Sequence, residues 1–294
     1  MISVIIPFYN EKDSLVILQN KLKKSLTLLK KEYEIIFVDD GSNDNGISRI
    51  KADGRLIKTV RLRKRLGKGN ALKVGLENST GDVVVFMDAD LQDDPDDLKK
   101  FVKKIEDGYD FVNGIRIGRK DGRLVKIYSK LAAKFLRKFL NSPFTDINCG
   151  FKAFKREAIG SFTFYGNNFR FLPLDVFYNG FRVTEVEVKN NERTYGESKY
   201  GPTKLIVGIF DTLTAFFIYK FAEKPLHFFG YTGVTTFFIG FAILFYLTLE
   251  RIFHRILLYR RPILFLGMLM VIVGIQIIMT GIIGELIVYF NKRK

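Results

Sequence analysis

Two long uncharged segments near the C-terminus constrain the fold of this chain more than any other feature. They cover residues 228–249 and 263–284, and a short basic segment separates them. At about 1.5 Å of rise per residue, a helix of this length spans ~33 Å, enough to cross a bilayer core of ~30 Å. The sequence therefore predicts two transmembrane helices, the alternative being a pair of buried core helices.

The net charge is the second constraint. The chain has 47 Lys and Arg against 31 Asp and Glu, which gives a formal net charge of +16. Half of this excess lies in residues 116–138, where nine basic side chains accompany one acidic side chain. In this segment apolar residues recur at helical spacing, while Lys126, Lys130 and Lys134 follow one another four residues apart. The apolar positions are Leu124, Ile127, Tyr128, Leu131, Phe135 and Phe139. We interpret the segment as a basic amphipathic helix that binds an anionic membrane surface, or as a packed helix with a solvated lysine face.

The N-terminal segment has neither a basic start nor a cleavage site, so we expect no signal peptide. We expect a cytoplasmic catalytic domain at 1–203, interfacial amphipathic helices at 204–225 and a transmembrane hairpin at 226–294. This makes the protein a multi-pass protein of the cell membrane, or of the endoplasmic reticulum membrane in a eukaryote. Arginines in the 250–262 loop and basic residues in the tail leave the topology of that loop open.

The first 203 residues alternate between short β-branched segments and helical segments. Strands are predicted at 3–7, 34–38, 59–62, 83–87, 111–114 and 183–188, with helices at 13–31 and 70–78. Such alternation is typical of an α/β fold with a mostly parallel, Rossmann-like sheet.

Polar residues follow four of these strands. The sequences are YNE at 9–11, DDGS at 39–42, GKG at 67–69 and DADLQ at 88–92. Ligands of such sheets bind beyond the carboxyl ends of the strands. We therefore expect these segments to meet in one crevice.

The residue types at these positions point to a metal and a nucleotide. Asp88 and Asp90 repel each other unless a cation lies between them, and with the Gln92 amide they suit Mg²⁺ or Mn²⁺, completed by phosphate oxygens. Lys68 lies in a glycine-flanked segment that could approach a diphosphate or form a plain turn. Asp39 and Asp40 could bind a base or ribose, or start an Asx turn. A polar loop at 193–199 could close over a diphosphate, or serve as a linker.

Several classes of protein are excluded or disfavoured. The only histidines are His227 and His254, so residues 1–225 hold no Ser-His-Asp triad and no histidine zinc site. The single cysteine, Cys149, excludes a disulfide framework. A basic membrane-tethered protein that binds nucleic acid remains an alternative, but it would leave Asp88 and Asp90 without a role, and we predict no nucleic-acid partner.

Seven segments occur in an order that resembles a known family. They are VIIPFYNE at 4–11, VDDGS at 38–42, GKG at 67–69, MDADLQ at 87–92, DINCGFK at 146–152, RFLP at 170–173 and RTYGESKY at 193–200. Together with the late GIIGE at 281–285, they resemble family 2 glycosyltransferases of the polyprenyl-phosphate type, the group of dolichol-phosphate mannose synthase and bactoprenol glucosyltransferase. A processive polysaccharide synthase is the nearest alternative, but its usual Gln-x-x-Arg-Trp signature needs a tryptophan, and the chain has none.

The resemblance implies a GT-A fold and a role for particular residues. It implies the nucleoside at Pro7, Tyr9, Glu11 and Asp40, the Mn²⁺ or Mg²⁺ at Asp88, Asp90 and Gln92, and the donor diphosphate at Arg193 and Lys199. It implies the acceptor phosphate at Arg116 and Ser129. Relatives often have Arg-Lys where this chain has Val125 and Lys126, so the second acceptor cation is either Lys126 or Arg123.

The expected reaction is inverting transfer of a sugar from a GDP- or UDP-linked donor to a polyprenyl or dolichyl phosphate. Asp90, Arg116 and Arg193 would be its central catalytic groups. Partners would be the donor, the lipid phosphate and the membrane surface, with homo-oligomerisation left open.

Overall fold

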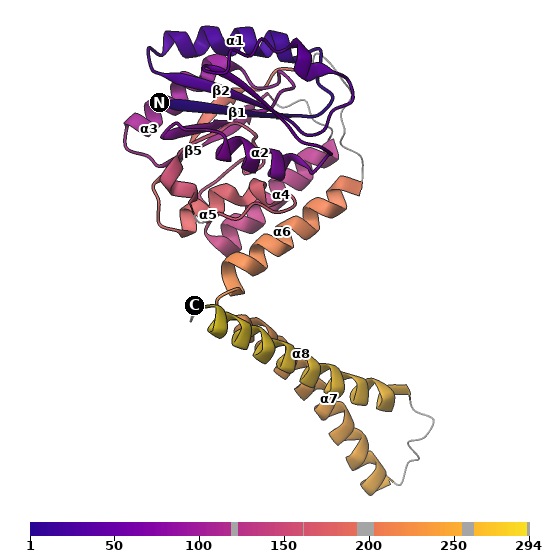
Figure 1. The fold of residues 1–294 in the computed structure, drawn as a ribbon. Coiled ribbons are helices and arrows are strands. Elements are labelled where there is room, and N and C mark those ends of the chain that lie inside the picture. The colour runs from indigo at the N-terminus through magenta and orange to yellow at the C-terminus, as the bar shows by residue number, and fades with distance from the viewer. Residues whose placement is uncertain (119–122, 161, 193–202, 255–261, 293–294) are drawn as a thin grey trace. The chain divides into compact units, whose positions relative to one another are not determined.

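The computed structural model describes residues 1–118, 123–160, 162–192, 203–254 and 262–292. The chain divides into two compact units, Met1–Ala215 and Phe216–Lys294 (Figure 1).

The first unit is built on a seven-stranded sheet with the order β3-β2-β1-β4-β6-β5-β7. The strands are β1 (Ile2–Phe8), β2 (Tyr33–Asp39), β3 (Ile57–Arg61), β4 (Val83–Phe86), β5 (Phe111–Ile117), β6 (Lys152–Lys155) and β7 (Val183–Lys189). All neighbouring strands are parallel except β6, which is antiparallel to both β4 and β5. This mostly parallel sheet has the GT-A architecture expected from the sequence.

Helices cover both faces of the sheet. The helices of the first unit are α1 (Leu15–Leu28), α2 (Lys68–Glu77), α3 (Leu98–Glu106), α4 (Arg123–Leu140) and α5 (Leu172–Tyr178), and α6 (Thr203–Phe221) begins in this unit and ends in the second. Short 3₁₀ helices occupy Gly46–Arg49, Pro95–Asp97, Arg156–Ile159 and Asn168–Phe171. The apolar stripes of α1 and α3 share one core with the β1 side chains Val4 and Ile6. On the opposite face α2 lies so close that a Cβ on Gly75 would be 2.3 Å from Ile5 Cγ2.

The predicted strands and helices are present, with ends that differ by a few residues. β6 was missed: it is only four residues long, has a lysine at each end, and is defined by its pairing with β4 and β5. It separates β4 from β5, and its N-terminal residue Lys152 lies beside the candidate site.

Helix α4 exposes part of its predicted apolar stripe. Among the side chains of α4 that the structure describes, from residue 131 on, Ala132, Leu136 and Leu140 are buried, whereas Leu131 is 63% exposed and Phe139 40% exposed. The predicted apolar stripe is thus partly on the outside of the unit.

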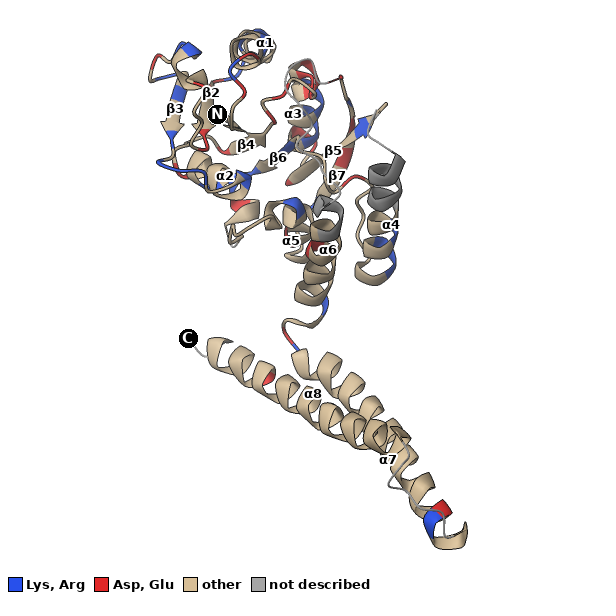
Figure 2. Cartoon of the chain, turned by 90° about the vertical axis from the view of Figure 1, so that its right-hand side faces the viewer, with Lys and Arg blue, Asp and Glu red and all other residues tan. Residues whose placement is uncertain are grey.

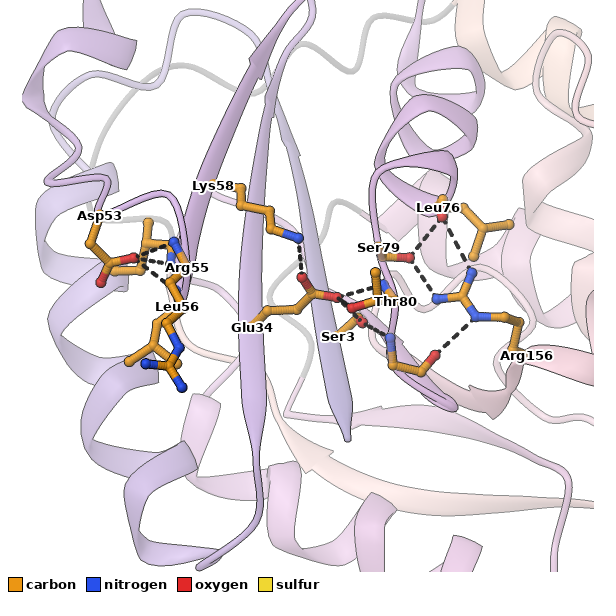
Figure 3. Close-up of polar contacts among 12 residues, drawn as sticks. Ser3, Glu34, Asp53, Arg55, Leu56, Lys58, Leu76, Ser79, Thr80 and Arg156 are labelled. Carbon is orange, nitrogen blue, oxygen red and sulfur yellow. Dashed lines mark hydrogen bonds and ion pairs between the residues drawn. The ribbon is translucent and has the colours of Figure 1, made fainter.

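A polar network joins the N-terminal ends of the strands (Figure 3). Glu34 is 2% exposed and accepts hydrogen bonds from Ser3 Oγ (2.7 Å), Thr80 N (2.6 Å) and Lys58 Nζ (2.6 Å). Burial alone would raise the pKa of Glu34, but these donors lower it to about 2. The network ties β1, β2 and β3 to the turn after α2, at the edge opposite the candidate site.

The second unit contains the end of α6 and a helical hairpin of α7 (Pro225–His254) and α8 (Pro262–Lys292). Glycines allow close packing: a Cβ on Gly240 would be 2.8 Å from Gly267 O, and one on Gly274 would be 2.6 Å from Phe237 N. Leu226 N donates to Glu285 Oε2 (3.2 Å), which satisfies one N–H in the first turn of α7.

The hairpin differs from the first unit in composition. Charged residues are spread over the first unit and are almost absent from α7 and α8 (Figure 2). Among the described residues, these two helices are long and apolar enough to cross a membrane, by length and composition. Only 17% and 11% of their most apolar windows are buried, so most of their apolar surface has no cover within the unit.

Candidate active site at the carboxyl ends of the strands

A cavity of about 200 Å³ opens where β1, β2 and β4 end. Its lining residues are Pro7, Phe8, Tyr9, Glu11, Asp40, Arg65, Gly67, Lys68, Asp88, Ala89 and Asp90. Seven predicted site residues therefore come together: Pro7, Tyr9, Glu11, Asp40, Lys68, Asp88 and Asp90.

One wall of the cavity is the loop between β3 and α2, which Asp40 holds in place. The Asp40 carboxylate accepts hydrogen bonds from Leu66 N (2.7 Å) and Gly67 N (3.0 and 3.1 Å). Gly67 has φ = 93°, a conformation that favours glycine. Asp40 thus shapes the wall as well as lining the cavity.

Arg65 is a lining residue that the sequence analysis missed. Its guanidinium carbon lies 4.2 Å from the centroid of the Tyr9 ring, which is a cation–π distance. Residues 61–68 contain five basic side chains and no acidic one. That concentration of charge was a visible signal for an anion-binding loop.

Asp39, the neighbour of Asp40, is not among the lining residues. Its side chain is 1% exposed, and its Oδ1 accepts from Ser42 N at 2.7 Å, which forms the Asx turn considered from the sequence. Its Oδ2 lies 3.3 Å from Arg61 Nε and makes no hydrogen bond to a described residue.

Asp88 and Asp90, which follow β4, also line the cavity. Lys68 Nζ forms an ion pair with Asp88 Oδ1 and lies 5.3 Å from the centroid of Phe169. Burial alone would raise the pKa of Asp88, but the charges of Lys68, Arg116 and Lys152 lower it. The Asp88 carboxylate is therefore negatively charged, and the cation that it binds in this structure is the Lys68 ammonium group.

The local backbone after β4 keeps Asp90 in the cavity. Asp90 Oδ1 accepts from Gln92 N at 3.2 Å, around Leu91 with φ = 62°. Gln92 itself is outside the lining set, and its carbonyl accepts from Asn191 N at 2.8 Å. Burial, together with the charges of Asp88 and Asp90, raises the pKa of the neighbouring Asp93 to about 7.

Two carboxylates in one cavity fit a hard divalent cation with oxygen ligands. In the described part of the chain no group of three or more His, Cys, Asp or Glu side chains could hold a metal ion by itself. A cation held by Asp88 and Asp90 would therefore take further oxygen ligands, such as those of water or a substrate phosphate, and Lys68 would have to release Asp88.

Arg116 is held in a second cluster, close enough to Asp88 for its charge to lower the pKa of that carboxyl. Its guanidinium binds the Asp146 carboxylate through Nε–Oδ2 (2.8 Å) and Nη2–Oδ1 (2.9 Å). Burial opposes the charge, but Asp146 raises the pKa of Arg116 overall. Asn113 Nδ2 donates to Asp146 O (3.0 Å) and to Glu185 Oε1 (3.1 Å). Arg116 was predicted from the sequence, but Asp146, Asn113 and Glu185 were given no role, because they are joined only by tertiary contacts between β5, β7 and the segment before β6.

The remaining predicted residues fall where less is described. Arg193 and Lys199 lie outside the described residues. Arg123, Lys126 and Ser129 belong to the first turns of α4, and their side chains are outside the described set.

Solved structures with this fold provide a comparison. Mannosyl-3-phosphoglycerate synthase from Rubrobacter xylanophilus is 18% identical, with a TM-score of 0.60 over 74% of this chain and 72% of that chain. Glucosyl-3-phosphoglycerate synthase from Mycobacterium tuberculosis, in complex with Mn²⁺, UDP and glucosyl-3-phosphoglycerate, is 20% identical. Its TM-score is 0.57 over 74% of this chain and 79% of that chain.

A sequence-family comparison covers the segment that contains the cavity. The model of glycosyl transferase family 2 matches residues 3–162, more than half of the chain. This range includes the ends of β1, β2 and β4, the loop before α2, and the Arg116–Asp146 pair. The chain belongs to glycosyltransferase family 2.

Proposed function

We propose that this chain transfers a sugar from a nucleotide-diphosphate sugar to a polyprenyl or dolichyl phosphate at a membrane surface. The observation that carries the proposal is the joining, in one chain, of a family 2 domain to two helices long and apolar enough to cross a membrane. A lipid acceptor explains both parts. The family 2 domain would bind the soluble sugar donor, and the two helices would hold that domain at the membrane that contains the insoluble acceptor.

The donor would bind in the cavity beyond β1, β2 and β4. Asp88 and Asp90 would hold Mn²⁺ or Mg²⁺, with Gln92 as the further ligand that the family resemblance implies. When bound, such a cation would stabilise the negative charge of the leaving diphosphate. Lys68, at the N-terminus of α2, would face the same diphosphate, as would Arg193 and Lys199. The glucosyl-3-phosphoglycerate synthase structure with Mn²⁺ and UDP supports this arrangement by fold.

The acceptor phosphate would meet Arg116. A phosphate monoester has a second pKa of about 6, so it is largely ionised at neutral pH and needs no strong base to attack. Direct attack at the anomeric carbon inverts its configuration. Ser129 and either Lys126 or Arg123 would add further donors to the acceptor phosphate.

Exposed apolar surface in the first unit supports a membrane location. On α4, Leu131 and Phe139 are exposed beside Lys134 and Lys138, a pattern that suits an anionic lipid surface. On α6, Val207, Phe210 and Leu213 are 44–64% exposed. We assign residues 1–203 to a cytoplasmic catalytic domain, 204–225 to interfacial helices, and 226–294 to a multi-pass membrane anchor.

The fold neighbours favour a second candidate acceptor. Both named relatives are synthases of sugar-linked 3-phosphoglycerate, a small phosphorylated acceptor. The Arg116–Asp146 pair would suit the phosphate of either acceptor. A small soluble acceptor leaves the apolar hairpin without a role.

The test is a donor panel. The purified full chain in detergent is incubated with Mn²⁺ or Mg²⁺, polyprenyl phosphate and one labelled GDP- or UDP-sugar at a time, and the products are extracted into organic solvent. We expect lipid-soluble label from at least one donor, dependent on the metal. No lipid-soluble label from any donor would refute the proposal.

A further inference from the structure

Lys152 is a buried cation to which the proposed reaction gives no role. It is the first residue of β6, pairs in register with Phe86 on β4 and Asn113 on β5, and is 3% exposed. β4 leads directly to Asp88, and β5 leads to Arg116. Lys152 therefore lies between the strands that carry the metal residues and the acceptor cation.

The Lys152 ammonium group uses all three of its protons. Nζ donates to Asn113 Oδ1 (2.9 Å), to Ile147 O (3.2 Å) and to Cys149 O. All three acceptors are neutral oxygens, and two are carbonyls of the loop 146–151. A buried charge is tolerated only when its hydrogen bonds are satisfied, so the ammonium fixes the positions of these oxygens.

One end of the loop 146–151 sets the position of Arg116. Asp146 binds its guanidinium through two hydrogen bonds. The Asp146 carbonyl accepts from Asn113 Nδ2 (3.0 Å), and the other atom of that same amide, Oδ1, accepts from Lys152. Lys152 thus determines which way the Asn113 amide faces, and through it the start of the loop.

The other end of the loop lies against Asp88. A Cβ on Gly150 would be 2.6 Å from Asp88 Oδ2, so the backbone at this position is in direct contact with the carboxylate. Gly150 follows Cys149, whose carbonyl Lys152 binds. A shift of the Cys149 carbonyl would therefore also shift the Gly150 backbone that contacts the Asp88 carboxylate.

We propose that Lys152 is a positioning residue that fixes the loop 146–151 and thereby holds Arg116 and Asp88 at one separation. Since these residues would bind the acceptor phosphate and the donor's metal, one buried ammonium aligns the two substrates. The identity of the two substrates in this inference rests on the proposed function. The effect of Lys152 on the position of the loop 146–151 is independent of that function.

The loop can be tested without any substrate. Cys149 is the only cysteine of the chain and is 1% exposed, so its reaction with a thiol reagent such as DTNB, measured where a denaturant titration shows each variant to be fully folded, reports opening of this loop. Lys152→Met removes the three donors and keeps the side-chain length. Lys155→Met is the matched control, because Lys155 is on the same strand and pairs with Asp110 (2.8 Å) away from the loop.

We expect Lys152→Met to raise the rate of Cys149 labelling at least about tenfold, the factor expected for one lost charge-assisted hydrogen bond. Lys155→Met should keep the wild-type rate. If Lys152→Met does not yield folded protein, Lys152→Gln, which retains an amide donor, should give a smaller increase in the same direction. A wild-type rate in the folded Lys152 variant, or equal acceleration in both lysine variants, would overturn the inference.

Kinetics separate positioning from a general loss of folded enzyme. We expect Lys152→Met to raise both the Mn²⁺ concentration for half-maximal activity and the KM for the phosphate acceptor. A fall in kcat with both half-saturation constants unchanged would show a merely structural role and overturn the positioning assignment. Failure of the proposed function would look different: the wild type would form no lipid product, while the difference in Cys149 labelling would persist.

Discussion

Gly150→Ala should impair transfer by displacing Asp88 without changing any polar group. An added Cβ would lie 2.6 Å from Asp88 Oδ2, 2.9 Å from its Cγ and 3.1 Å from its Oδ1. Ordinary contacts begin near 3.4 Å, so the carboxylate has to move by about 0.8 Å. Misplacement of a reacting group by about 1 Å can cost about 100-fold in rate. We therefore expect a loss of roughly 10- to 100-fold in the rate of sugar transfer.

The assay is transfer from the best nucleotide-sugar donor over a range of Mn²⁺ concentrations. Because Asp88 is proposed to bind the metal ion, its displacement should also raise the Mn²⁺ concentration for half-maximal activity. Gly160→Ala is the control, since its Cβ would be 3.7 Å from the nearest atom, Glu157 O, and should leave both quantities unchanged.

The thermal unfolding temperature of both glycine variants shows whether they are folded. Wild-type rate and wild-type Mn²⁺ dependence in folded Gly150→Ala would refute the reasoning. In that case the position of Asp88 could not be critical to metal binding.

Three further predictions concern the metal residues, the network at the strand ends and the hairpin. Asp90→Asn should lower transfer at least about 100-fold, because it removes a charged metal ligand but retains an oxygen for Gln92 N; normal turnover in this variant would remove the metal assignment. Glu34→Gln should lower the free energy of unfolding by about 2–3 kcal/mol at pH 7, measured by denaturant titration. Because the folded state lowers the pKa of Glu34 from 4.5 to about 2, this difference should hold above pH 4.5 and shrink as the pH falls toward 2; a constant difference would contradict it. Gly274→Leu should lower the unfolding temperature of the hairpin in detergent, because its Cβ would meet the Phe237 backbone at 2.6 Å, whereas Gly230→Ala, at 3.7 Å from its nearest neighbour, should not.

The strands that could be predicted are those whose own amino-acid composition already favours a buried strand. β1 and β2 are mostly apolar, β-branched segments that are buried along almost their whole length, so composition alone located them. β6 was not predictable because its sequence, KAFK, carries no strand signal and its pairing partners are distant in sequence. On α4 the periodicity predicted an apolar stripe but could not show which side of the helix meets the core: Leu131 and Phe139 are exposed, whereas Leu136 is buried.

The candidate site was predictable to the extent that parallel strands bring their carboxyl ends together. That rule placed Asp40, Lys68 and Asp88 in one cavity. It could not show that both oxygens of Asp40 bind backbone N–H groups, nor that Lys152 is buried beneath the loop 146–151. Those facts depend on tertiary contacts between residues far apart in the chain.

Partition of labelled sugar between two acceptors tests the proposed function most directly. The full chain is reconstituted in vesicles that contain polyprenyl phosphate, with 3-phosphoglycerate at equal concentration in the surrounding buffer, and supplied with Mn²⁺ and the labelled nucleotide sugar. We predict that the label enters the organic phase and that the aqueous phase contains no glycosylated phosphoglycerate. Label that appears only in glycosylated phosphoglycerate would contradict the assignment of a lipid acceptor.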